Sequence, residues 1–73
     1  MDTRTATAKR VAAAIEAAGE TKLGIAEKTH IPRTTLLRRL AGVTPFYVDE
    51  LHAIAGVLGV SVVDLLPDGE DAA

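Results

Sequence analysis

Residues 31–42 of the chain, IPRTTLLRRLAG, combine three arginines and two threonines with three leucines. An arginine side chain presents a planar fork of donors that fits a guanine edge or a phosphate, while threonine offers a hydroxyl to phosphate and a methyl to thymine. Side chains of these types within one short segment indicate a surface that binds a polyanion such as nucleic acid.

The charge of the chain is distributed unevenly along its length. The net charge is −2, yet residues 22–39 carry five cations and one glutamate, and the charged residues after residue 40 are all acidic. An acidic protein with a basic middle segment has a candidate face for nucleic acid. The alternative is an ordinary solvated charged surface, which would have the same pattern.

Length and composition limit the elements that can position these residues. At 73 residues the chain is expected to form one small domain, without cysteines for disulfides or thiolate metal sites. Its apolar residues are mainly aliphatic, with one phenylalanine and one tyrosine, which favours packed helices. No apolar stretch approaches the length of a membrane span, and the N-terminal segment is a poor match to a signal peptide. We therefore expect a soluble, cytoplasmic protein.

Helical spacing and capping residues predict a compact all-α domain of five short helices. They are expected at residues 7–18, from Thr21 to Thr29, from about residue 32 to Gly42, from Thr44 and Pro45 to Gly59, and from Ser61 to Pro67. Gly24 lies inside the second helix, and close approach of a neighbouring helix is the expected reason. The domain is expected to span residues 1–67, and the acidic residues 68–73 are predicted to be disordered.

The third predicted helix divides its side chains between two faces when they are placed at about 100° per residue. The face predicted to lie against the core consists of Leu36, Leu37 and Leu40. The face predicted to point outward consists of Thr34, Thr35, Arg38 and Arg39, with Arg33 in the first turn. The outward face is therefore made of hydrogen-bond donors and positive charge.

The segment TKLGIAEKTHIPRTTLLRRLAG, residues 21–42, resembles the helix-turn-helix of the lambda-repressor and Cro family. Ile25, Ala26, Ile31 and Leu36 match positions that the family buries, and LHAIAGVLGVSVVDLL downstream matches its closing helices. The resemblance covers about residues 8–66 without an insertion. It implies a five-helix DNA-binding domain whose third helix enters the major groove.

The resemblance also implies a role for individual residues. Those matching positions that read base edges are Arg33, Thr34 and Arg38. Those matching positions on the DNA backbone, or without a settled role, are Thr21, Lys22, Thr35, Arg39, Thr44 and Tyr47. The sequence departs from the family at His30, where glycine is usual, and at Arg39 and Leu40, where an apolar and a polar residue are usual. Whether Arg39 faces the groove is therefore left open.

The function implied is a sequence-specific regulator of transcription that occupies an operator on double-stranded DNA, as small phage repressors and Cro-like proteins do. The alternative is an antitoxin-like protein-interaction module. An enzyme is not expected, because the chain lacks a plausible nucleophile and base pair, a phosphate-binding loop or a metal cluster. Neither a cofactor, a metal nor a small-molecule ligand is expected. The last predicted helix offers a homodimer interface or ordinary core packing through Val62, Val63, Leu65 and Leu66.

Overall fold

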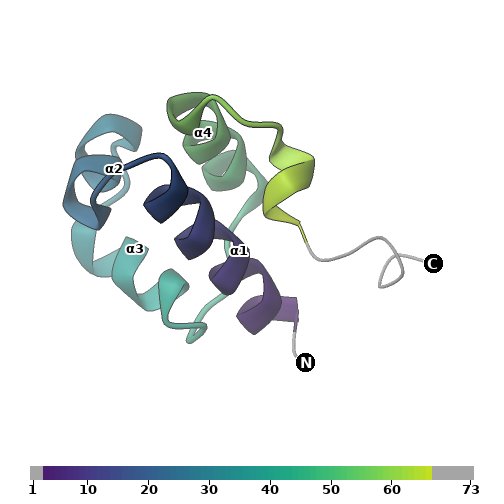
Figure 1. Cartoon of the computed structure of the whole chain (residues 1–73). Helices are drawn as coiled ribbons and strands as arrows, with labels where there is room; N and C mark the ends of the chain where they lie inside the picture. The colour runs from purple at the N-terminus through teal and green to yellow at the C-terminus, as the bar shows by residue number, and fades with distance from the viewer. Residues whose placement is uncertain (1–2, 67–73) are drawn as a thin grey trace.

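A computed structural model of the chain describes residues 3–66, which form helices joined by short connections, with no strand among them (Figure 1). Its elements are α1 (Thr3–Ala17), α2 (Lys22–Thr29), α3 (Arg33–Leu40), α4 (Val48–Leu58) and the 3-10 helix η1 (Val62–Leu65). In the view of Figure 1, α2 and α3 lie on one side of α1 and η1 lies on the other. α1 contacts both α3 and η1, and α4 contacts α2 and η1, so the elements enclose one core.

Every element contributes one fully enclosed side chain to this core. These side chains belong to Val11, Ile25, Leu36, Ile54 and Leu65, in chain order from α1 to η1. Burying an aliphatic side chain of this size stabilises the fold by about 1.5–3 kcal/mol. The buried positions predicted in α2, in the turn after it and in α3 are confirmed, since Ile25, Ile31 and Leu36 all belong to the core cluster.

α1 begins at Thr3, four residues earlier than the alanine-rich pattern predicts. The additional turn lies against the end of α3, where the Arg4 Nη1 donates a hydrogen bond to the carbonyl oxygen of Val43 at 3.3 Å. Thr7, in the second turn of the helix, is buried. Tertiary contacts therefore extend α1 beyond the segment that local preferences define. Its other end agrees with the prediction, because Gly19 has a left-handed φ of +72°.

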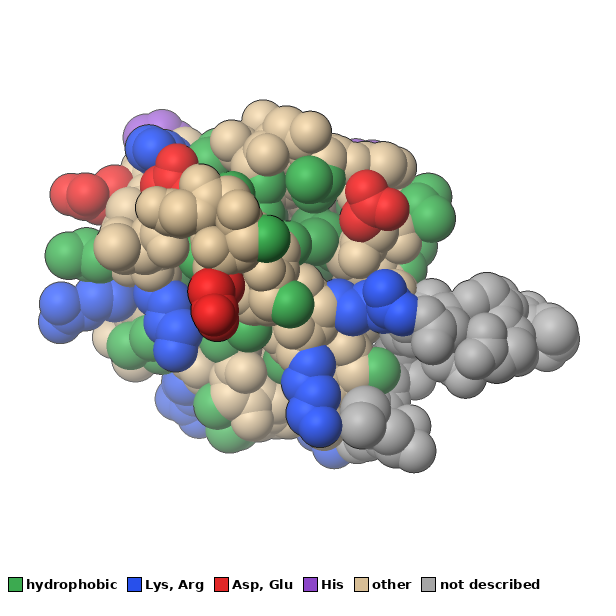
Figure 2. Space-filling view, in the orientation of Figure 1, with side chains coloured by type: hydrophobic (Ala, Val, Ile, Leu, Met, Phe, Trp, Pro, Cys, Tyr) green, Lys and Arg blue, Asp and Glu red, His purple; other side chains and the backbone are tan. Residues whose placement is uncertain are grey.

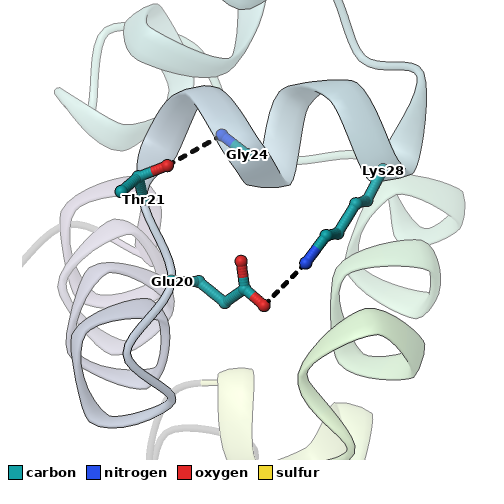
Figure 3. A network of polar contacts seen from close by, with 4 residues as sticks. All are labelled: Glu20, Thr21, Gly24 and Lys28. Carbon is teal, nitrogen blue, oxygen red and sulfur yellow. Dashed lines mark hydrogen bonds and ion pairs between the residues drawn. The ribbon is translucent and has the colours of Figure 1, made fainter.

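α2 has the capping residue that the sequence predicts. The Thr21 hydroxyl accepts a hydrogen bond from the Gly24 backbone N–H at 2.9 Å (Figure 3). The predicted reason for a glycine at position 24 is wrong, because no neighbouring helix approaches it. A Cβ atom there would lie 3.0 Å from the Thr21 hydroxyl oxygen and 3.4 Å from Glu20 Oε1. The glycine instead leaves room for the capping side chain and for the Glu20 carboxylate.

The start of α4 differs from the prediction. Thr44 and Pro45 were expected to begin the helix, but it begins at Val48 with Tyr47 as the N-cap residue. The Glu50 carboxylate accepts a hydrogen bond from the Tyr47 backbone N–H at 2.8 Å, which satisfies one of the unpaired donors at the helix start. Val48, the first residue of the helix, is exposed.

The prediction of a fifth α-helix is wrong, because residues Val62–Leu65 form a single 3-10 turn. Its hydrogen bonds join residues three apart, from the Asp64 N–H to the Ser61 carbonyl and from the Leu66 N–H to the Val63 carbonyl. The predicted cap is present, because the Ser61 hydroxyl accepts a hydrogen bond from the Val63 N–H at 3.2 Å. Pro67 and the predicted disordered tail, 68–73, lie outside the described residues.

Candidate nucleic-acid interface

The outward face of α3 is formed by Arg33, Thr34, Leu37 and Arg38, all of which are exposed. Thr35 is half-buried. Two predicted placements are wrong: the Leu37 side chain is 43% exposed rather than in the core, and the Arg39 side chain is only 11% exposed rather than outward. α3 is therefore rotated relative to the predicted orientation, and a leucine rather than a fourth polar residue completes its exposed face.

Arg39 is held by residues of the segment that follows α3. Its Nη1 donates a hydrogen bond to the Thr44 hydroxyl at 2.9 Å, and its guanidinium carbon lies 4.7 Å from the centre of the Tyr47 ring. Its Nε lies 2.7 Å from Glu50 Oε1, an ion-pair distance, although the N–H is not directed at that oxygen. Arg39 thus connects the end of α3 to the start of α4.

The structure places Thr44 and Tyr47, which were predicted to contact the DNA backbone, in this same group. Thr44 is half-buried, and its hydroxyl oxygen accepts the hydrogen bond from Arg39. Tyr47 is exposed, with its backbone N–H bonded to Glu50 and one face of its ring against Arg39. Their contacts with Arg39 position the α3–α4 connection.

The five cations of residues 22–39 fall into two classes in the structure. Lys28 forms an ion pair with Glu20 at 2.8 Å (Figure 3), and Arg39 forms one with Glu50. The others are Lys22, Arg33 and Arg38, which are exposed and make no hydrogen bond or ion pair with any described residue. The positive charge left without an internal partner in this segment is therefore concentrated on α3 and on the first residue of α2.

The surface view agrees with this distribution. Lys and Arg side chains gather mainly in the lower half of the view in Figure 2, over α3 and the N-terminal part of α1, and most Asp and Glu side chains lie above them. Arg4 contributes to this side of the molecule, since its contact with Val43 places it at the end of α3. The exposed face of α3 thus lies on the more basic side of the domain.

The turn between α2 and α3 determines how α3 is presented. His30 adopts a left-handed conformation with φ +63°. The turn thus forms with histidine at this position, although a residue with a Cβ atom is less favourable than glycine in this conformation. Ile31 is buried directly after it, and Pro32 is the N-cap of α3 without a side-chain hydrogen bond. Thr21 and Lys22 are exposed at the opposite end of α2.

The apolar residues of η1 are not equivalent. Leu65 is fully buried and Val62 packs against the core, so core packing, one of the two predicted roles, accounts for these two residues. Val63 and Leu66 are exposed, and these two are the residues of the predicted set that a partner could reach. Most of the apolar character of η1 is therefore explained by closure of the core.

The part of the chain that the structure describes contains neither a metal-binding cluster nor a membrane-spanning helix. No group of three or more His, Cys, Asp or Glu side chains within residues 3–66 could hold a metal ion. Over the same residues, every helix is too short or too polar to cross a membrane.

A scan of the chain against protein-family models found no match, and searches of curated proteins and of solved structures found no significant similarity. Function must therefore be inferred from the residues of α3 and from the elements around them.

Proposed function

We propose that this protein binds double-stranded DNA sequence-specifically through α3 and regulates transcription by occupying an operator. The observation that carries the proposal is the exposed face of α3, where Arg33 and Arg38 project without any internal partner among the described residues. Two arginines on one helix face with no partner among the described residues, in a chain of net charge −2, form a local positive surface that favours an anionic ligand.

The dimensions of α3 suit the major groove. An α-helix is about 10–12 Å across with its side chains, and the major groove of B-DNA, about 12 Å wide, admits it. Leu36 holds the opposite face of the helix in the core, so the exposed face is presented rigidly. Residues 21–42 then act as a helix-turn-helix, with α3 as the recognition helix.

The exposed residues divide by the part of DNA that each can bind. Arg33, Thr34 and Arg38 share the outward face of α3 and are proposed to contact base edges, where arginine pairs with guanine through two hydrogen bonds. Thr21 and Lys22 stand at the N-terminus of α2, where backbone N–H groups and a positive side chain favour phosphate. Base contacts would determine which sequence is bound, and phosphate contacts would set the register of the domain on the duplex.

The proposal is tested by selecting duplexes from a random library with the protein and titrating a selected duplex and a scrambled one by fluorescence anisotropy at fixed salt. We expect clear preference for the selected duplex. Arg38→Ala should weaken that binding about 5- to 150-fold, which corresponds to the roughly 1–3 kcal/mol of one good base contact. Lys28→Ala is the matched control, because it removes the same charge from a side chain already paired with Glu20. It should change the affinity little.

Equal affinity of the unaltered protein for both duplexes would contradict sequence-specific binding. Equal losses for Arg38→Ala and Lys28→Ala would show that only overall charge matters, and would contradict base readout by α3.

A further inference from the structure

We propose that Leu37 reads the methyl group of a thymine in the major groove, an inference that rests on the proposed DNA-binding function. Leu37 is 43% exposed and does not belong to the core cluster or to the side chains packed against it. A single exposed leucine on a protein surface needs no explanation. The position of this one does, because it stands within the face proposed to enter the groove.

Leu37 is surrounded by the proposed base-reading residues. It follows Arg33 by four residues and Thr34 by three, the two spacings that bring side chains together on a helix, and Arg38 is the next residue. Any partner that covers Arg33 and Arg38 together therefore also covers Leu37. The chemistry that suits both the arginines and the leucine identifies that partner.

Arg33 and Arg38, which have no partner among the described residues, favour DNA over the apolar surface of a protein. An apolar protein surface on Leu37 would enclose two guanidinium groups without acceptors, and burial of an unpaired charge is strongly unfavourable. A duplex supplies phosphate and guanine oxygens to the arginines and presents apolar groups in the same groove. The charge around Leu37 thus favours a duplex over an apolar protein surface.

The chemistry of the groove then selects the base. Every base presents a donor or an acceptor there, and a leucine side chain placed against such a group would leave it without a partner. Thymine alone presents a methyl group on its major-groove edge. The bound sequence is therefore expected to contain a thymine opposite Leu37.

Replacement of thymine by deoxyuridine tests this inference directly, because it removes the methyl group and leaves every hydrogen-bonding group of the base in place. Starting from the selected duplex, each thymine is replaced in turn and the dissociation constant is measured by anisotropy. For the unaltered protein, one replacement should weaken binding about fourfold, the effect of losing one buried methyl group. Leu37→Ala should bind the thymine and deoxyuridine duplexes with equal affinity.

Two control variants establish whether Leu37 itself contacts the thymine methyl group. Val60→Ala truncates an exposed aliphatic side chain that lies after α4, away from the exposed face of α3. It should keep the fourfold discrimination between thymine and deoxyuridine. Thr34→Ser removes the only other methyl group among the exposed residues of this face and keeps the hydroxyl. It should also keep the discrimination at the position that Leu37 reads. Each comparison is the ratio of the dissociation constants of one variant for two duplexes. A change in the stability of the variant affects both constants equally and leaves the ratio unchanged.

The outcomes distinguish this inference from the function on which it rests. If a sequence is selected but no replacement weakens binding, or if Thr34→Ser and not Leu37→Ala abolishes the discrimination, the assignment to Leu37 is overturned. If no sequence is selected over random duplex, the proposed function fails and the inference fails with it.

Discussion

Arg38 and Arg39 are neighbours in the sequence, but α3 gives them different environments. Arg38 is exposed and has no partner among residues 3–66, whereas Arg39 is largely enclosed by Thr44, Tyr47 and Glu50. Arg39 is therefore expected to contribute to the stability of the fold, and Arg38 to DNA binding.

This difference predicts unequal effects of the two alanine variants on stability. Arg39→Ala should lower the free energy of unfolding by about 2 kcal/mol, because a hydrogen-bonded charge and its packing are lost and Glu50 is left without its cation. Arg38→Ala should change it by less than about 0.5 kcal/mol, as is usual for an exposed residue. Urea denaturation followed by circular dichroism measures both values. Similar losses for the two variants would contradict the different environments of the two arginines.

At the scale of the elements, the α2–α3 turn contains a strained residue. His30 has φ +63°, a conformation that is unfavourable for any residue with a Cβ atom, and it is the only non-glycine residue with positive φ among those described. The turn is also what fixes the direction of α3 after α2. The turn therefore contains backbone strain at the place that orients α3, the helix of the proposed interface.

His30→Gly should raise the free energy of unfolding by roughly 0.5–1 kcal/mol, because relief of the left-handed strain exceeds the entropy cost of glycine. Gly19→Ala is the complementary variant, since Gly19 has φ +72° and open space around a Cβ atom. It should lower the free energy of unfolding by about 1 kcal/mol through strain alone. Thermal melts measure both changes. A lower melting temperature for His30→Gly would indicate that the imidazole makes a contact that stabilises the turn.

At the scale of the whole molecule, the fold depends on a core to which all five elements contribute. Its side chains come from segments up to about fifty residues apart, so loss of one large side chain weakens contacts throughout the domain. A domain of this size is stable by only about 4–11 kcal/mol. We therefore expect residues 3–66 to unfold as one cooperative unit.

Leu36→Ala should lower the free energy of unfolding by about 2–5 kcal/mol, and the melting temperature by about 10 °C or more, because Leu36 is fully buried. Leu37→Ala removes the same atoms from an exposed position and should cost less than about 1 kcal/mol. Far-UV circular dichroism, which follows the helices, and fluorescence of Tyr47, the only tyrosine, should give coincident transitions. Separate transitions would show that the α3–α4 connection unfolds independently of the core.

Local rules were sufficient for much of the fold. The Thr21 cap, the glycine ends of α1 and α3, and the buried positions Ile25 and Leu36 were all predicted, because a cap or an apolar period depends on residues within one or two turns. The concentration of basic residues in the middle of the chain is likewise a property of the sequence. These features define a small helical domain with a basic segment.

The composition of the exposed face was decided only by the tertiary structure. Leu37 and Arg39 lie about 80° on either side of the line midway between Leu36 and Leu40, so helical periodicity cannot tell which of them turns inward. Arg39 does so because Glu50, eleven residues later, provides a carboxylate at the start of α4. In the same way Glu20 neutralises Lys28. Which charges remain exposed depends on partners distant in the sequence, and only the packed fold brings them together.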